Sequence, residues 1–215
     1  MNITEIHIRR AEPTDAEAFA RMFEMPRVVW GTLQLPYPSV EQWRKRLAEP
    51  PDGLYGLVAC VDASSRTVPN ESRLRDDASV ENQVVGSVGL HTFPHNTRRK
   101  HVAQLGMMVR DDWQGKGVGA ALMRAAVELA DKWLNVTHIE LEVYADNEPA
   151  LRLYKKFGFE IEGTLKQHAF RDGVYVDSYF MARLRPQLEI RNWKLEVGRW
   201  KLEVGGWKLE VGGWT

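Results

Sequence analysis

The chain has 215 residues, of which 44% are hydrophobic and 27% charged, proportions ordinary for a globular protein with a substantial core. Its length favours one compact domain with additional segments, or at most two small domains. Lysine plus arginine and aspartate plus glutamate both total 29, so the basic excess typical of nucleic-acid-binding proteins is missing. No apolar run is long enough to span a bilayer, and the first ten residues lack the apolar core of a signal peptide. These features argue against nucleic acid or membrane as partners and predict a cytoplasmic protein.

The cysteine count and the histidine spacing do not favour a metal centre. Cys60 is the only cysteine, which excludes an internal disulfide and a zinc–thiolate cluster, and its apolar surroundings predict a buried side chain. His91 and His95 have the spacing of a helical metal pair, but Pro94 between them disfavours a helix. We therefore expect no metal.

The N-terminal quarter predicts a strand and two helices. Ile6-His7-Ile8 alternates as a short strand does, and Thr14-Asp15-Ala16-Glu17 has the form of a capping box that begins a helix. A second capping box, Ser39-Val40-Glu41-Gln42, begins another helix. Residues 26–38 between the two helices are predicted to form a loop, whose many apolar and aromatic residues either line a pocket or pack on the core.

The next segments predict six strands and two helices. A long helix over 117–133 carries an apolar stripe from Val118 to Trp133, and a second begins at Asn147 and ends at a glycine cap, Gly158. Arg171-Asp172-Gly173 is a hairpin signal. The order predicts an α/β (α+β) fold, a mixed sheet with helices on both faces. The expected strands are 54–61, 84–91, 102–109, 139–143, 160–170 and 174–184, and the polar stretch 62–82 between the first two is predicted to be an extended hairpin loop.

A change of composition divides the chain into a domain over 1–185 and a tail over 186–215. The tail repeats Trp-Lys-Leu-Glu-Val-Gly every seven residues. Glycine in every repeat disfavours a coiled coil, whereas the alternation of apolar and charged residues favours short strands in a meander. The alternative is a poorly ordered repeat appended to the domain, and we assign the tail no chemistry.

The glycine-rich segment from Gln114 to Gly119 lies between a strand and a helix. Glycines at a helix N-terminus let backbone N–H groups approach an anion, and Lys116 adds a full positive charge. This pattern predicts a phosphate or pyrophosphate site. The same glycines also fit the dinucleotide-binding fingerprint, and Glu140 lies roughly 20 residues further on, where that fingerprint has its ribose-binding acid. In that fingerprint, however, the strand runs almost directly into the first glycine, whereas residues 110–114 intervene here.

Two blocks of the sequence resemble the GNAT superfamily of N-acetyltransferases. Residues 108–119 look like its acetyl-CoA motif, and residues 146–150 with 153–159 look like its second conserved block. The resemblance spans about 6–184. It is closest to small bacterial L-amino acid N-acetyltransferases, as judged from the segments 33–36, 154–164 and 173–183. It implies a mixed, mostly antiparallel sheet of six to seven strands.

The resemblance also implies a set of site residues. Acetyl-CoA is the expected co-substrate, without a metal. A strand over 105–109 would splay from its neighbour and offer its backbone to the pantetheine arm, and Gly106 is compatible with a bulge there. The residues expected to bind acetyl-CoA are Met107, Met108, Val109, Gln114, Gly115, Lys116, Gly117, Val118, Gly119 and Asn147.

The same resemblance assigns the proton transfers. Tyr154 matches the tyrosine that protonates the leaving sulfur, and Glu142 occupies a position where some members carry the general base, with Glu140 on the same strand face. The expected acceptor is a small-molecule amine, most specifically the α-amino group of a free amino acid. A homodimer is compatible with the sequence. The alternatives are a peptide or protein N-terminal acetyltransferase, a non-catalytic acyl-CoA-binding module and a dinucleotide oxidoreductase.

Overall fold

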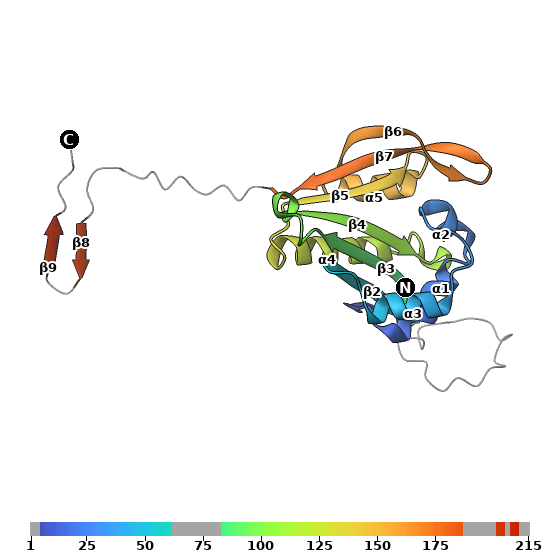
Figure 1. Cartoon of the computed structure of the whole chain (residues 1–215), viewed down its shortest axis with the longest axis horizontal. Coiled ribbons are helices and arrows are strands. Elements are labelled where there is room, and N and C mark those ends of the chain that lie inside the picture. Colours follow the sequence, from blue (N-terminus) through green and yellow to red (C-terminus); the bar gives the residue numbers. More distant parts are fainter. Residues whose placement is uncertain (1–4, 62–82, 187–200, 205–206, 211–215) are drawn as a thin grey trace. The chain divides into compact units, whose positions relative to one another are not determined.

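The computed structural model describes residues 5–61 and 83–186, together with two short strands in the tail (Figure 1). Met1–Arg185 forms one compact unit and Pro186–Thr215 a second. In the second unit, β8 (Lys201–Val204) and β9 (Trp207–Glu210) pair antiparallel. The polar segment 62–82 and the rest of the repeat tail lie outside the described residues.

A seven-stranded sheet with the order β1-β2-β3-β4-β5-β7-β6 forms the centre of the first unit. All neighbouring strands run antiparallel except β4 and β5, so the mixed, mostly antiparallel sheet is confirmed. The tight turn expected at Asp172 and Gly173 is also present, because both residues have the positive φ that such a hairpin turn requires. The strands are β1 (Ile6–Arg10), β2 (Leu54–Val61), β3 (Gln83–Thr92), β4 (Val102–Val109), β5 (His138–Tyr144), β6 (Glu160–Arg171) and β7 (Val174–Leu184).

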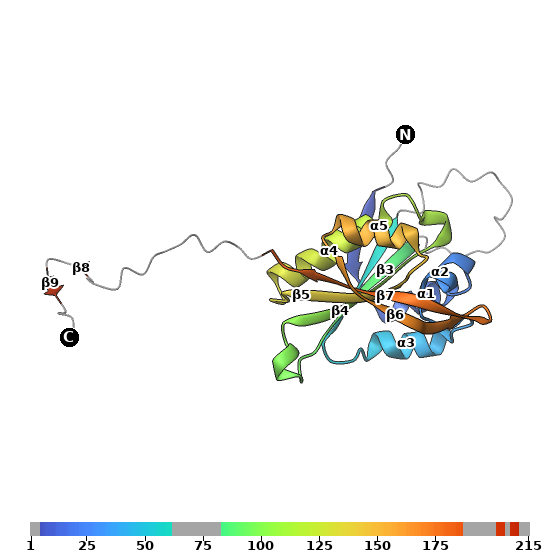
Figure 2. The same cartoon turned by 90° about the horizontal axis from the view of Figure 1, so that it is seen from above.

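Helices cover both faces of this sheet, as predicted (Figure 2). α4 and α5 pack with one set of alternating strand residues, among them Ala59 and Val61, in the larger core. α1 and α3 pack with the opposite set, including Val58 and Cys60, in a smaller one. The helices are α1 (Ala16–Met22), α2 (Pro26–Gly31), α3 (Val40–Ala48), α4 (Val118–Lys132) and α5 (Glu148–Lys156).

The prediction of a loop throughout 26–38 was wrong, because Pro26–Gly31 forms the short helix α2. Proline at its first position presets the helical φ. Its N-terminus is capped by Asp111, whose carboxylate accepts the N–H groups of Arg27 and Val28 at 3.0 and 3.1 Å. The capping residue is more than 80 positions away in the chain, so no local pattern could reveal it.

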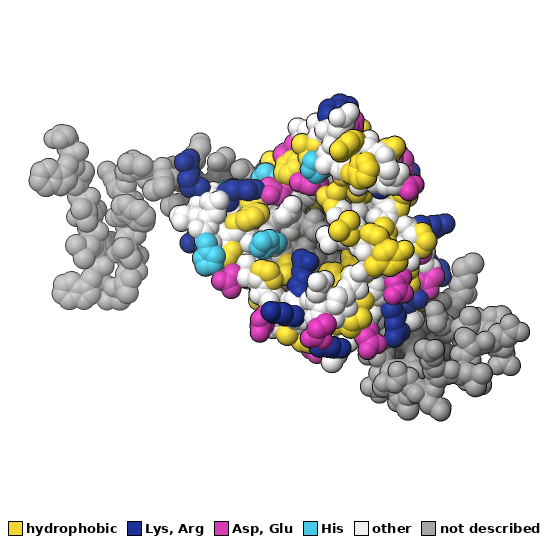
Figure 3. Space-filling view, turned by 45° about the vertical axis from the view of Figure 1, so that its right-hand side comes forward, with side chains coloured by type: hydrophobic (Ala, Val, Ile, Leu, Met, Phe, Trp, Pro, Cys, Tyr) yellow, Lys and Arg dark blue, Asp and Glu magenta, His cyan; other side chains and the backbone are white. Residues whose placement is uncertain are grey.

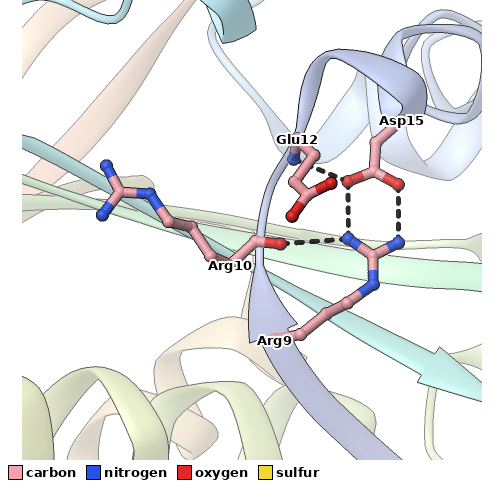
Figure 4. Close-up of polar contacts among 4 residues, drawn as sticks. All are labelled: Arg9, Arg10, Glu12 and Asp15. Atoms are coloured by element: carbon pink, nitrogen blue, oxygen red, sulfur yellow. Dashed lines mark hydrogen bonds and ion pairs between the residues drawn. The ribbon is translucent and has the colours of Figure 1, made fainter.

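The two predicted capping boxes differ in outcome. Ser39 does cap α3, since its hydroxyl accepts the N–H of Gln42 at 3.3 Å. The first box was misplaced: a 3-10 turn over Pro13–Asp15 precedes α1. Asp15 accepts the N–H of Glu12 and forms a bidentate ion pair with Arg9 at 2.7 and 2.8 Å (Figure 4). That ion pair joins β1 to the start of α1.

The apolar stripe of α4 was predicted one residue too long. The helix buries Val118, Leu122 and Ala126 as expected. It ends at Lys132, and Trp133 leaves the helical path and is 76% exposed.

The strands β4 and β5 separate partway along their length. Val102–Gln104 pair in parallel with residues 138–140, and no pairing continues beyond them. β4 stays in unbroken register with β3 up to Val109, so the bulge considered at Gly106 is not present. The opening therefore arises only on the β5 side and leaves the C-terminal half of β4 without a partner on that edge. In Figure 1 the two ribbons diverge at the end nearer α2.

Candidate active site

A cavity of about 480 Å³ lies at the opening between β4 and β5. Its walls come from both sides of the sheet: the end of β1, strands β2 to β5, the helices α1 and α3, the segment that follows α2, and Tyr154 of α5. The space-filling view in Figure 3 shows a hollow on this side of the molecule with hydrophobic side chains along its margin. Among the residues proposed from the sequence, four line the cavity: Met107, Met108, Glu142 and Tyr154.

Tyr154 is held by α5 with its ring packed in the larger core. Its side chain packs at an angle against Phe159, with ring centres 5.8 Å apart, and the residue is 7% exposed. Burial penalises the charged phenolate and raises the pKa of Tyr154 to about 12. The phenol therefore keeps its proton at neutral pH, which a proton donor to a leaving thiolate requires.

The structure separates the two glutamates of β5. Glu140 is buried and accepts two hydrogen bonds of 2.7 Å from Arg99, whose guanidinium also stacks on Phe93 at 4.6 Å. Glu142 lies two residues further along, where β5 has left β4, and it lines the cavity with a side chain that is 26% exposed. Its carboxylate lies 3.7 Å from His168 Nε2. Glu142 is therefore accessible to an acceptor amine, whereas Glu140 is engaged elsewhere.

The glycine segment has the geometry of an anion-binding turn. Gly115 and Gly117 have φ values of 73° and 88°, and Gly117 is the N-cap of α4. No atom lies within 4 Å of the position that a Cβ would take at either glycine, so the backbone is open to a ligand. Gly119 is needed for packing instead, because a Cβ there would approach Leu153 to 3.1 Å. These residues do not line the cavity but follow β4 directly, and Gln114 hydrogen-bonds the carbonyl of Val109 at 3.2 Å.

Two further residues from the sequence prediction have structural contacts. Lys116 lies 5.0 Å from the ring centre of Trp113, a cation–π arrangement that holds its ammonium beside the turn. Asn147 caps α5 by accepting the N–H of Ala150 at 3.3 Å, and it does not line the cavity. A Cβ on Gly31 would lie 3.3 Å from the side-chain nitrogen Nδ2 of Asn147, so the end of α2 lies close to Asn147.

Sequence reasoning missed a cluster at the far end of β5, here called the Arg171 clip. The guanidinium of Arg171 lies between the rings of Trp30 and Tyr144, 4.2 and 4.5 Å from their centres, and pairs with Asp146. The Tyr144 hydroxyl donates to the carbonyl of Thr32 at 3.1 Å. The clip joins the β6–β7 hairpin to α2 and to the segment that lines the cavity. Trp30, Tyr144 and Arg171 are far apart in the chain, so no local sequence pattern indicated it.

Over the described ranges, no three His, Cys, Asp or Glu side chains gather as metal ligands would. The helices of those ranges include none that is both long and apolar enough to span a membrane.

Comparison with known proteins identifies the family. Residues 24–159 match the model of the acetyltransferase (GNAT) family. The chain belongs to this family. It is 43% identical over 183 residues to the L-amino acid N-acetyltransferase AaaT of Escherichia coli, a match that spans 85% of this chain and all of that enzyme. It is therefore an N-acetyltransferase, and the dinucleotide interpretation of the same glycines is excluded.

Solved structures with the same fold include ligand complexes. A spermidine N-acetyltransferase from Vibrio cholerae in complex with CoA and spermine has a TM-score of 0.65 and 22% identity, covering 84% of this chain and 95% of that one. An acetyltransferase from Salmonella typhimurium solved with its cofactor acetyl-CoA has a TM-score of 0.64 and 16% identity, covering 85% and 95%. Neighbours of this fold thus bind CoA or acetyl-CoA.

Proposed function

We propose that this GNAT N-acetyltransferase transfers the acetyl group of acetyl-CoA to the α-amino group of a free amino acid with an apolar side chain. The observation that carries the proposal is that Glu142, Tyr154 and two arginines line one cavity with an apolar wall. The likeness to the L-amino acid enzyme of Escherichia coli supports the same acceptor class.

The charge of the cavity favours an acceptor with a carboxylate. Arg10 and Arg46 both contribute to its lining, and arginine is the side chain best suited to bind a carboxylate, through two parallel hydrogen bonds. In Figure 4 the side chain of Arg10 points away from the Arg9–Asp15 ion pair, so it is not engaged there. Two guanidinium groups also disfavour a polycationic acceptor such as spermine.

The apolar wall favours a large acceptor side chain. Phe23 and Trp43 stack in the smaller core with ring centres 5.6 Å apart, and both contribute to the cavity lining. Burying a side chain of the size of leucine or phenylalanine against such a wall contributes roughly 1.5–3 kcal/mol. A short polar amino acid would forgo that contribution.

The donor end of the site would be formed by backbone. The open turn at Gly115 and Gly117 and the N-terminus of α4 would hold the pyrophosphate of acetyl-CoA, with Lys116 beside it. The unpaired edge of β4, from Leu105 through Met107 and Met108 to Val109, would hold the pantetheine arm and polarise the thioester carbonyl. Gln114 would brace the turn against β4, and Asn147 would act from the start of α5.

Proton balance assigns the two catalytic side chains. A protonated amine carries three protons, of which one remains in the amide, one ends on the CoA sulfur and one is released to water. Glu142 accepts a proton so that the neutral nitrogen can attack the thioester carbon. When the C–S bond breaks, the Tyr154 phenol protonates the thiolate. The second proton that the amine nitrogen loses, as the amide forms, restores the phenol.

A series of acceptors tests the proposal by the release of CoA thiol. Phenylalanine and methionine should be turned over, whereas phenethylamine and phenylalanine amide, which lack the carboxylate, should lose at least tenfold in kcat/KM. Efficient turnover of spermidine, together with no turnover of any free amino acid, would refute the proposal. Preference for a dipeptide over the free amino acid would favour N-terminal peptide acetylation instead.

A further inference from the structure

A bulge in β6 directs His168 toward Glu142. Between residues 165 and 169 the register against β7 shifts, so that four steps along β6 span two steps along β7. In a regular strand, His168 would point to the opposite face from its neighbours at 167 and 169, because side chains alternate. The bulge breaks this alternation and places His168 Nε2 3.7 Å from Glu142 Oε2, across the intervening strand β7. Bulges commonly redirect a side chain beside an active site.

Specific bonds hold the bulge in an unfavourable conformation. Gln167 has a φ of 49°, which residues other than glycine seldom adopt. Its N–H donates to Asp177 Oδ1 at 2.9 Å, and the Lys166 ammonium donates to Asp177 Oδ2 at 2.7 Å. The lysine and the backbone N–H together lower the pKa of Asp177, so this anchor stays ionised. A strained backbone that is held by a buttressing side chain suggests a functional role.

His168 is behind Glu142 as seen from the cavity. Glu142 lines the cavity and His168 does not, while the His168 side chain is 30% exposed. The imidazole therefore links a carboxylate inside the site to solvent outside it. Imidazole is the side chain that most readily exchanges protons near neutral pH.

We infer that His168 is a positioning residue that takes from Glu142 the proton released by the acceptor amine and passes it to water. This inference rests on the proposed function, because it requires Glu142 to be the base. The amine N–H bond breaks as the Glu142 O–H bond forms. That proton then moves to the neutral imidazole nitrogen, which restores the carboxylate, and the imidazolium releases it to solvent.

Two further polar groups lie near the proposed proton route from Glu142 to His168. The bulge in β6 contains the charged side chain of Lys166, which is paired with Asp177 on β7. Ser178, on the same strand as Asp177, lies opposite Tyr144 and so on the same sheet face as Glu142. Its hydroxyl is buried and has no hydrogen-bond partner within the described residues. This face of β7 thus presents a polar group where a purely structural surface would be apolar.

Two variants of His168 and a matched histidine control test the inference. His168→Gln keeps the size and the hydrogen-bonding capacity but cannot carry the proton. It should lower kcat about tenfold at pH 7, leave the KM for acetyl-CoA within twofold, and lose less at pH 9 and above, where the amine arrives neutral. Added imidazole should raise the kcat of His168→Ala several-fold. His95→Gln, an exposed histidine outside the cavity lining, should match the wild-type protein in every measurement.

The anchor of the bulge provides an independent arm. Asp177→Ala should reproduce the loss seen with His168→Gln, and combining the two should add little, because both act through the same contact. A His168→Gln enzyme with wild-type kcat, or a loss that is equal at all pH values and not relieved by imidazole, would overturn the inference. If Glu142→Gln turned over at the wild-type rate, both the base and the proton route would be wrong. A wild-type protein that acetylates no amino acid would refute the proposed function itself.

Discussion

Replacing Tyr154 by phenylalanine removes one oxygen atom from the cavity and leaves the surrounding packing in place. The ring contacts with Phe159 and the larger core do not involve the hydroxyl, so we expect a folded variant. Loss of a general acid costs about 10²- to 10⁴-fold in rate, which raises the barrier by about 2.7–5.5 kcal/mol. The turn proposed to hold the pyrophosphate belongs to the start of α4, so the KM for acetyl-CoA should change less than threefold.

Thiol release is a suitable assay because the only cysteine of the chain, Cys60, is buried and adds little background. Tyr55→Phe is the matched control: it removes a tyrosine hydroxyl from the same core, outside the cavity lining. A kcat for Tyr154→Phe within twofold of the control would show that another group protonates the sulfur.

Three further outcomes are expected. The pKa of Tyr154 is raised to about 12, so the folded protein retains a proton that the unfolded chain loses near pH 10. Between these pH values the wild-type protein should lose about 2.7 kcal/mol of unfolding free energy relative to Tyr154→Phe, as measured by urea denaturation. If the unfolding free energies of the two proteins changed with pH in the same way, the burial argument would be contradicted. Gly117→Ala should weaken CoA binding, measured by calorimetry, at least tenfold. The control Gly173→Ala introduces similar strain, at a φ of 82° in the β6–β7 turn, and should leave CoA binding unchanged. If both variants bound CoA equally well, the glycine turn would not belong to the donor site. Arg171→Ala should raise the KM for the amino acid several-fold with a smaller change for acetyl-CoA, whereas an unchanged KM would mean that the clip does not shape the acceptor side.

Most strand boundaries were predictable because their signals are local. The strands β2, β4 and β7 begin and end at the predicted residues, since alternating apolar positions and turn residues delimit them. The hairpin at Asp172 and the cap at Gly158 follow from the same short-range chemistry. The family blocks around Gly117 and Tyr154 were recognisable for the same reason, as runs of adjacent residues.

The remaining features depend on residues distant in the chain. Glu140 and Glu142 share a strand face and look equivalent in the sequence, and they are distinguished by distant contacts, with Arg99 for Glu140 and with His168 for Glu142. α2 needed a cap from Asp111, and the bulge at His168 depends on Asp177 of the next strand. The apolar part of the cavity lining combines residues from α1, α3 and β2, which no local pattern could bring together.

The cap of α2 has a consequence for how the binding of the two proposed substrates is coupled. Asp111 lies in the turn that leads from β4 into the glycine segment, and its carboxylate holds the first N–H groups of α2. α2 leads into Thr32 and the segment that lines the acceptor side of the cavity. A ligand that steadies the glycine segment should therefore also steady this part of the cavity lining, on the side where we propose that the amino acid binds. Because such coupling is reciprocal, each substrate should tighten the binding of the other, and saturation with CoA should lower the dissociation constant of the amino acid.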